Sequence, residues 1–393
     1  MLPRLLCLAV LCLPLHGHAL TSEEIQRFID EASRSKDGGE VVIPPGRHLI
    51  ERPLQIRAAK RLQIIGLDPE ITTLQLPPLA FAEAQSTADT GAREIAARRL
   101  QHLGPGMRLH IEAPGEVEPF TQKPRPYHLA TVQAVEGSRI LLKEPLRFPC
   151  PAGTLIRDAD APNLFEIHAG CEDIHIGKLT LDGGRVDGDP PVRGHTQLCA
   201  IFAQGAYSDE KGPTGPSVKG LRVIRCFIQN CHGRGIALYA CQEPLIEDCT
   251  IRDTTDEAID FDHFTAGGIA RHNHIARSLV GVELNDASGC RVEQNDLMDC
   301  GTGIHLWRWC RQPGLNENNL ILGNQIDRTT GNAIQTATGT RANTFRANLI
   351  HASGKNGILL AGEGQVVNDN RITASGGKDI AIHEGTHTLD PAR

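Results

Sequence analysis

Apolar residues recur in one register along the second half of the chain. Pairs of a small residue and a β-branched aliphatic residue repeat at spacings of 23, 23, 22, 30, 24 and 22 residues. These pairs are Gly235-Ile236, Ala258-Ile259, Gly281-Val282, Gly303-Ile304, Ala333-Ile334, Gly357-Ile358 and, more weakly, Asp379-Ile380. A second column, followed two residues later by an aliphatic, consists of Cys226, Cys249, Asn273, Asn295, Asn324, Asn348 and Asn370. Two columns in one register indicate a repeat protein.

The period and the residue types predict the architecture. A period of 22 to 24 residues, with short apolar alternations and Gly, Asn and Asp between them, is typical of a solenoid. The leucine ladder of leucine-rich repeats is missing, and the β-branched and asparagine columns favour a right-handed parallel β-helix. Coils of such a helix stack about 4.8 Å apart, so equivalent residues become vertical neighbours. We expect the aliphatic column to fill the core and the asparagines to hydrogen-bond along the stack.

A single helix is predicted ahead of the coils. The segment from Thr21 to Ala32 opens with a Thr-x-x-Glu capping box and places apolar residues on one face. The first coil of a solenoid otherwise exposes its core and its strand edges. We therefore expect this helix to cover that open end.

Several segments resemble the pectate-lyase-like superfamily of secreted β-helix proteins. They are "VVIPPGRHLI", "PLQI" and "LQIIGL" after the expected helix, then "IHIGKLTLDGG" and the seven coils. The resemblance covers most of the chain and implies an all-β, right-handed parallel β-helix. It implies no single reaction, because folds of this kind host several chemistries.

The remaining segments complete the predicted organisation. Residues 80–160 break the period and alternate like antiparallel strands, which predicts a β-rich insertion, and the Gly/Pro-rich segment 206–220 predicts a loop able to wall one side of a groove. The expected parts are a signal peptide (1–19), the cap helix and first coils (20–79), the insertion (80–160), the coils (161–385) and a tail (386–393).

The N-terminus and the composition bound the location and the partners. Arg4, an apolar run from Leu5 to Leu15 and His18-Ala19 as a cleavage end predict a secreted or periplasmic protein. No later segment has 18 uncharged apolar residues, so we expect no membrane insertion. A net charge of −7 gives no basic footprint for nucleic acid. Because no CxxC pair is present, no structural zinc site is predicted. Cys226 and Cys249 stack, either as a disulfide or as two thiols.

Acidic residues gather in two outward columns of the predicted coils. Because the aliphatic residue of each pair points inward, the next residue and the one two further on point outward, so Asp260 and Asp262 are expected to face solvent. The first column is Ala237, Asp260, Glu283, His305, Gln335, Leu359, and the second is Tyr239, Asp262, Asn285, Trp307, Ala337, Ala361. The polar members should form one patch over three coils, with His263 and Arg308 at its edges.

This patch predicts acid–base chemistry on a carbohydrate. Asp260 above Glu283 places like charges about 4.8 Å apart, so one carboxyl is expected to keep its proton beside an ionised base. Asp260 and Asp262 should lie about 7 Å apart, near the separation in inverting glycosidases, whereas Asp260 and Glu283 are nearer to the retaining separation. The predicted catalytic residues are Asp260, Asp262 and Glu283, and the predicted substrate-binding residues are Asn285, His305, Trp307, His263, Arg308 and Gln335.

Other readings of the patch stay open at this stage. The leading hypothesis is a secreted glycoside hydrolase acting on a polysaccharide. The alternatives are a polysaccharide lyase or uronate epimerase assisted by Ca²⁺ or arginine, and a non-catalytic glycan-binding or structural β-helix, whose acids hold Ca²⁺ or only meet solvent. The pair Asp256-Glu257, expected in a turn, resembles the paired acids of polygalacturonases, although Val280 replaces their following histidine. The run "DFDH" resembles the acidic-His segment of alginate epimerases without its proline. His232 and Arg234 are candidates to extend the patch or to serve the turn.

Overall fold

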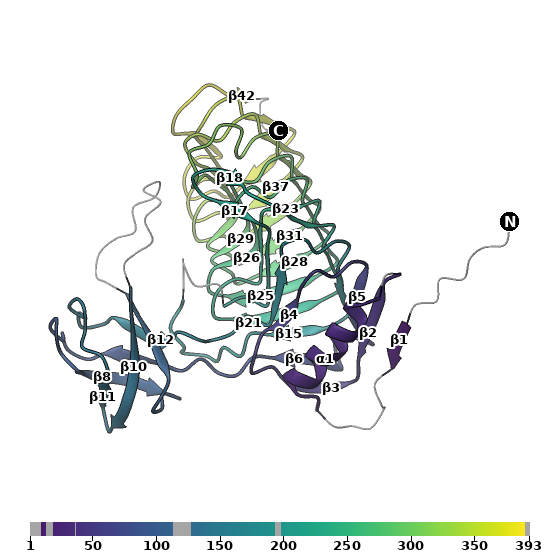
Figure 1. The fold of residues 1–393 in the computed structure, drawn as a ribbon. Helices are drawn as coiled ribbons and strands as arrows, with labels where there is room; N and C mark the ends of the chain where they lie inside the picture. The colour runs from purple at the N-terminus through teal and green to yellow at the C-terminus, as the bar shows by residue number, and fades with distance from the viewer. Residues whose placement is uncertain (1–8, 13–18, 36, 113–126, 193–197, 390–393) are drawn as a thin grey trace. The chain divides into compact units, whose positions relative to one another are not determined.

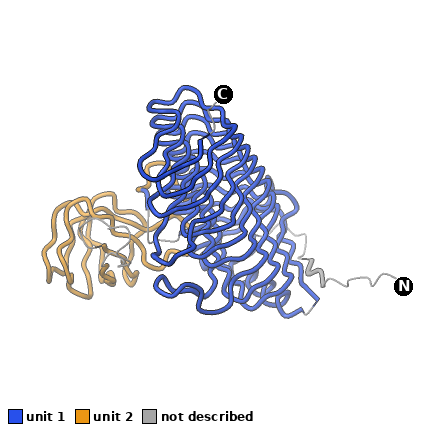
Figure 2. The backbone as a smooth tube through the Cα atoms, turned by 90° about the horizontal axis from the view of Figure 1, so that it is seen from above, with its two compact units in different colours: residues 1–76, 163–183, 191–393 blue, residues 77–162, 184–190 orange. Residues whose placement is uncertain are grey.

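The computed structural model describes residues 9–12, 19–35, 37–112, 127–192 and 198–389. The chain forms two compact units (Figure 2). The first consists of residues 1–76, 163–183 and 191–393, and the second of residues 77–162 and 184–190. The first unit is a stack of coils around one core, and α1 (Ser22–Ser33) is the only helix among the described residues (Figure 1).

Three long parallel sheets build the first unit, and each coil visits sheets A, B and C in that order. Sheet A contains β1 (Ala9–Cys12), β2 (Gly39–Ile43), β5 (Leu62–Gly66), β14 (His175–Gly177), β20 (Arg222–Ile224), β24 (Leu245–Glu247), β27 (Ile269–Arg271), β30 (Arg291–Glu293), β33 (Leu320–Leu322), β36 (Thr344–Arg346), β39 (Val366–Asn368) and β42 (Thr388–Leu389). Sheet B contains β3 (Gly46–Leu49), β6 (Thr72–Gln75), β15 (Thr180–Asp182), β21 (Phe227–Cys231), β25 (Thr250–Thr254), β28 (His274–Ala276), β31 (Asp296–Met298), β34 (Gln325–Asp327), β37 (Leu349–His351) and β40 (Arg371–Thr373).

Sheet C carries the acidic columns. It contains β4 (Leu54–Ile56), β13 (Phe165–His168), β16 (Ile201–Gln204), β22 (Ile236–Tyr239), β26 (Glu257–Asp262), β29 (Val280–Asn285), β32 (Thr302–Trp307), β35 (Ile334–Thr336), β38 (Ile358–Leu360) and β41 (Ile380–Ile382). Short pairs flank the coils, β17 (Tyr207–Ser208) with β18 (Gly212–Pro213) and β19 (Val218–Lys219) with β23 (Cys241–Gln242). The predicted parallel β-helix is confirmed.

The predicted register is that of the structure. Ile236, Ile259, Val282 and Ile304 are successive partners on neighbouring strands of sheet C, and all are fully buried. The residue before each must be small because the next coil passes close by. A Cβ added at Gly281 would lie 2.6 Å from the carbonyl oxygen of Gly303. The small-aliphatic pair is therefore a packing requirement of the stack.

Asparagine side chains form a ladder inside the stack. Asn324 Nδ2 donates to Asn348 Oδ1 at 3.0 Å and to the Val292 carbonyl at 2.8 Å, while its own Oδ1 accepts from Asn295 Nδ2 at 2.9 Å. The ladder extends from Asn273 to Asn370, as predicted. A second ladder that was not anticipated runs through Asn319, Asn343 and Gln365.

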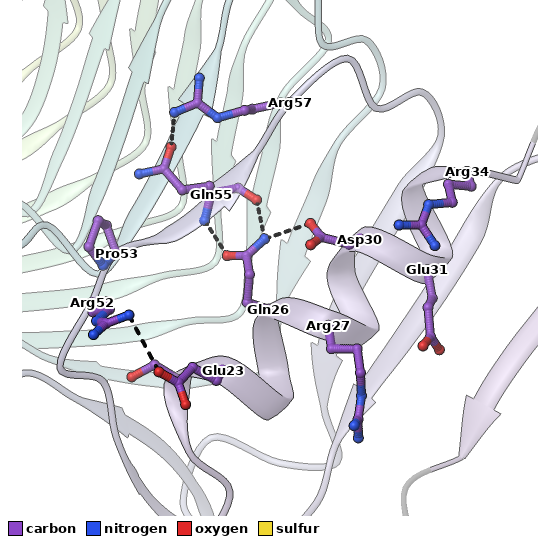
Figure 3. A pocket seen from close by; sticks show the side chains of 11 residues that line it. Glu23, Gln26, Arg27, Asp30, Glu31, Arg34, Arg52, Pro53, Gln55 and Arg57 are labelled. Atoms are coloured by element: carbon purple, nitrogen blue, oxygen red, sulfur yellow. Dashed lines mark hydrogen bonds and ion pairs between the residues drawn. The ribbon is translucent and has the colours of Figure 1, made fainter.

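Helix α1 has the predicted cap and apolar face. The Thr21 hydroxyl accepts from the Glu24 backbone, the Glu24 carboxylate accepts from the Thr21 backbone, and Ile25 and Ile29 are fully buried against the coils. A groove of about 530 Å³ lies between α1 and the chain around β4 (Figure 3). Its polar side chains pair with one another, since Gln26 bonds both Asp30 and the backbone of Gln55.

The second unit is a closed six-stranded antiparallel barrel with a core of its own. Its order is β10 (Tyr127–Glu136), β11 (Arg139–Leu142), β8 (Glu94–Gln101), β7 (Phe81–Ala84), β12 (Leu155–Asp158) and β9 (Arg108–Glu112). The β-rich insertion expected from the broken period is thus a barrel, which closes its own sheet edges.

The structure bears on the predicted signal peptide and on the pair of Cys226 and Cys249. The predicted signal peptide lies mostly outside the described residues, and within it Ala9–Cys12 forms β1, parallel to β2. Cys226 and Cys249 are buried thiols, which resolves the alternative between a disulfide and two thiols. Among the described residues, no helix is long and apolar enough to cross a membrane.

The asparagine ladder should contribute strongly to stability. We expect Asn324→Ala to lower the free energy of unfolding by about 2–4 kcal/mol, because a fully buried backbone amide and carbonyl lose their partners. Gln325→Ala, at the exposed neighbouring position, should change it by less than about 0.5 kcal/mol. Urea unfolding followed by circular dichroism measures both, and equal effects of the two substitutions would contradict the ladder's role.

Candidate active site

The outer face of sheet C brings the predicted patch together. Asp260 on β26 pairs in register with Glu283 on β29, which pairs with His305 on β32, which pairs with Gln335 on β35. Asn285 is the register partner of Trp307. The side chains that the repeat predicted as vertical neighbours therefore share one face over three coils.

The expectation that Asp260 and Asp262 face solvent is wrong. Asp260 is 0% and Asp262 1% exposed, because Arg234 and the aromatic side chains around His263 cover them. Glu283 and Asn285 are also buried, whereas His305 and Trp307 are half-buried. The patch is closed over β26 and opens toward β32.

Arg234 is the cation at the centre of the acids. Its Nε lies 2.5 Å from Glu257 Oε2 and 3.0 Å from Asp260 Oδ2, and all three side chains are buried. Burial lowers the pKa of a guanidinium, but Glu257, Tyr239 and Asp260 raise the pKa of Arg234 well above its usual value. Arg234 therefore stays charged and compensates the acids.

Asp260 is the carboxyl that keeps a proton most readily. Burial raises its pKa well above the usual value, and the negative charge of Asp262 adds to this effect against the opposing charge of Arg234. Apart from the ion-pair contact of Oδ2 with Arg234 Nε, neither Asp260 oxygen has a hydrogen-bond partner among the described residues. A buried, protonated carboxyl with an oxygen that has no partner can give its proton to a bound molecule.

His305 and Trp307 form the more exposed end of the site, next to the buried Glu283. His305 Nδ1 lies 2.7 Å from Glu283 Oε2, and the His305 and Trp307 rings are 5.3 Å apart. Burial raises the pKa of Glu283, with Glu257 adding to the rise and His305 opposing it. His305 Nε2 and Asn285 Oδ1 are buried without a hydrogen-bond partner, so both are available to a ligand.

Asp262 and His263 form a pair that is held on several sides. His263 Nδ1 and its backbone N–H both contact Asp262 Oδ1, and the ring stacks on Tyr239 with centroids 5.0 Å apart. Tyr207, from the loop predicted at 206–220, packs edge-on to the same ring at 5.1 Å. Burial raises the pKa of Asp262, but His263 outweighs this and lowers it below the usual value.

The hydrogen bonds of Arg308 and Gln335 go to groups other than the acids of the patch. The guanidinium of Arg308 donates to four backbone carbonyls, those of Cys310, Gly339, Arg311 and Gln312, so it holds a loop closed. Gln335 accepts from Asn332 Nδ2 at 2.8 Å and is half-buried at the edge of the patch. Trp309 belongs to the same loop, where its backbone N–H donates to Asp286.

Sequence reasoning underestimated three members of the site. Glu257, expected in a turn, opens β26 and contacts Arg234. Arg234, weighed only as an extension of the patch, is its central cation. Tyr207 comes from a loop with no repeat register. Alternation alone could not have found Glu257, because it stands two residues before the inward Ile259 and strict alternation would point it into the core.

Arg234 should be essential for stability. We expect Arg234→Gln to lower the free energy of unfolding at neutral pH by about 3–5 kcal/mol, because buried Glu257 loses its counter-charge and Asp260 loses its ion-pair contact. Arg225→Gln, which breaks an exposed 3.9 Å pair with Asp248, should cost less than about 1 kcal/mol. Thermal unfolding at neutral pH measures both variants, and equal losses would contradict this role of Arg234.

Comparison with known proteins agrees on the fold. Residues 207–320 match the family described as "Right handed beta helix region". No curated protein matches the sequence. The A-module of the mannuronan C-5 epimerase AlgE6 of Azotobacter vinelandii superposes with a TM-score of 0.52 and 13% identity, over 96% of this chain and 97% of that one. The DFA-IIIase of Arthrobacter chlorophenolicus A6 also gives a TM-score of 0.52 and 13% identity, over 95% and 92%.

These likenesses establish the hand and type of the coil, and the resemblance seen in the sequence is confirmed. The chain is a right-handed parallel β-helix protein.

Proposed function

We propose that this protein is a carbohydrate-active enzyme, a glycoside hydrolase in which Asp260 and Glu283 act on opposite sides of one glycosidic bond. The observation that carries this proposal is the pairing of the two residues in register on neighbouring strands. Neighbouring strands lie about 4.8 Å apart, which is close to the carboxyl separation of about 5–5.5 Å in retaining glycosidases. Asp262, also predicted as catalytic, is held by His263 and serves in this proposal to raise the proton affinity of Asp260.

The roles follow from the surroundings of each carboxyl. Protonated Asp260 donates to the glycosidic oxygen while ionised Glu283, beside His305, attacks the anomeric carbon and displaces the leaving sugar. Water then breaks the glycosyl–Glu283 bond, and Asp260 takes a proton from that water. Deprotonation of Asp260 should therefore set the alkaline limb of the pH profile, since its raised pKa extends the active range upward.

In this proposal the substrate approaches from the half-buried end of the patch, at His305 and Trp307. Trp307 offers an apolar ring surface beside His305, and Asn285 Oδ1 and His305 Nε2 are polar atoms without partners. An aromatic face with convergent polar groups suits a sugar ring. Both structural relatives named above carry carbohydrate-related names, which supports a glycan as the substrate class. Export to a secreted or periplasmic location is part of this proposal and rests on the N-terminal pattern.

Product analysis on neutral and uronic polysaccharides, with and without a chelator, tests the reaction. On a glycan that the wild type cleaves, Asp260→Asn and Glu283→Gln should each lower kcat by roughly 10²–10⁴-fold. Asp296→Asn, an exposed carboxylate on sheet B, is the matched control and should not change kcat. Full turnover by either active-site variant would refute the assignment.

The stereochemistry gives a second, independent check. Proton NMR of the first product should show a retained anomeric configuration, and Glu283→Ala with added azide should yield a glycosyl azide. An inverted product would instead favour Asp260 with Asp262. An unsaturated uronate product, or exchange of a proton beside the uronate carboxylate in heavy water, would assign a lyase or an epimerase. Binding without turnover on every glycan would assign a non-catalytic module.

A further inference from the structure

A second cluster of chemically active side chains lies behind His263. Asp209, His263 and Cys310 each offer one atom, and these three atoms all lie within 4.8 Å of one another. His263 Nε2 is 3.5 Å from Asp209 Oδ1. Two ligands on one tetrahedral zinc ion are roughly 3.3–3.6 Å apart, given the usual zinc–ligand lengths. The His263–Asp209 separation already matches this geometry.

We propose that Asp209, His263 and Cys310 bind a divalent transition-metal ion, with zinc the best match, in a site that goes beyond the proposed hydrolysis. The ligand atoms are one Asp209 carboxylate oxygen, His263 Nε2 and the Cys310 sulfur. A thiolate and an imidazole favour zinc over Ca²⁺ and Mg²⁺, which prefer oxygen ligands. Three protein ligands leave a fourth position for water, and Asp209, whose side chain is 37% exposed, lies on the route from solvent.

His263 is oriented as a metal-binding histidine would be. Its Nδ1 contacts Asp262, so the other ring nitrogen, Nε2, is directed toward Asp209. The ring is further held by the stack on Tyr239 and the edge contact with Tyr207. A carboxylate behind a histidine is the usual outer shell of zinc sites, so Asp262 is a positioning residue here.

Cys310 and Asp209 are held by loops that are tied to each other. Asp286 accepts from the backbone N–H groups of Trp309 and Cys310 at 2.9 and 2.8 Å, which fixes the position of the thiol. Gln312, in the same loop as Cys310, donates to the Asp209 carbonyl. Phe264, Leu315 and Cys310 form a hydrophobic cluster, and Tyr207 packs against it. One side of the proposed site is therefore lined by apolar groups.

Metal binding by the full-length chain tests the proposal without any activity assay. The chain is first stripped of metal with a chelator, then given zinc and dialysed, and the wild type should then hold one zinc per chain. Co²⁺ added instead of zinc should give a thiolate charge-transfer band. Cys310→Ser should abolish that band, and Asp209→Asn and His263→Gln should weaken zinc binding at least tenfold. Asp262→Asn should weaken it by about 10–100-fold. Cys150→Ser and His274→Gln, which alter a buried thiol of the barrel and an exposed histidine, are the controls and should bind like the wild type.

Several results would overturn the site. They are no stoichiometric zinc in the wild type, a Co²⁺ complex without a thiolate band, or binding of Ca²⁺ alone. Unchanged affinity in the variants that fold would do the same. If Cys310→Ser does not fold by circular dichroism, Asp209→Asn decides, because its side chain is partly exposed in a short loop. Loss of turnover with intact metal binding would contradict only the hydrolase, so the two proposals fail separately.

Discussion

The parallel register between coils is the constraint on which the rest of this structure depends. Each coil hydrogen-bonds to the next through three sheets, so a side chain stands over its equivalent about 4.8 Å away. Aliphatic columns then become a core, and asparagine columns become ladders in which each amide satisfies its neighbour. The same rule forces any acids that share a column into contact, whatever that contact costs.

In sheet C that cost is offset by a cation from outside the column. Asp260, Glu257 and Glu283 could not be buried together as three charges. Arg234, from the turn before β22, pairs with Glu257 and Asp260, while Glu283 contacts His305 within the column. Desolvation then leaves Asp260 with a raised proton affinity. The energetic problem created by stacking is therefore also what prepares a proton donor for catalysis.

Loops between coils decide how this face meets solvent. The loop from Tyr207 to Pro213 and the loop from Arg308 to Leu315 carry no repeat, yet they pack around His263 and cover Asp262. Arg308 fixes the second of these loops, because its guanidinium donates to four backbone carbonyls. His305 and Trp307, which are half-buried, form the side of the patch from which we propose that a substrate enters. In the same region the loops bring Asp209 and Cys310 to His263, which is the basis for the proposed metal site.

The sequence by itself determined the β-helix, its register, the cap helix and the presence of a β-rich insertion. Coils that pack on one another in the same way repeat the same residue types at a fixed spacing. The capping box of α1 involves residues only three positions apart, so it can be recognised in the sequence. It also placed Asp260, Glu283 and His305 in one column, because that follows from the period and from alternation. Only the tertiary structure decided that Asp260 and Asp262 are buried, that Arg234 and Glu257 belong to the site, and that Asp209 and Cys310 meet His263. Burial depends on what non-repeating loops cover, and contacts between three coils leave no spacing such as CxxC in the chain.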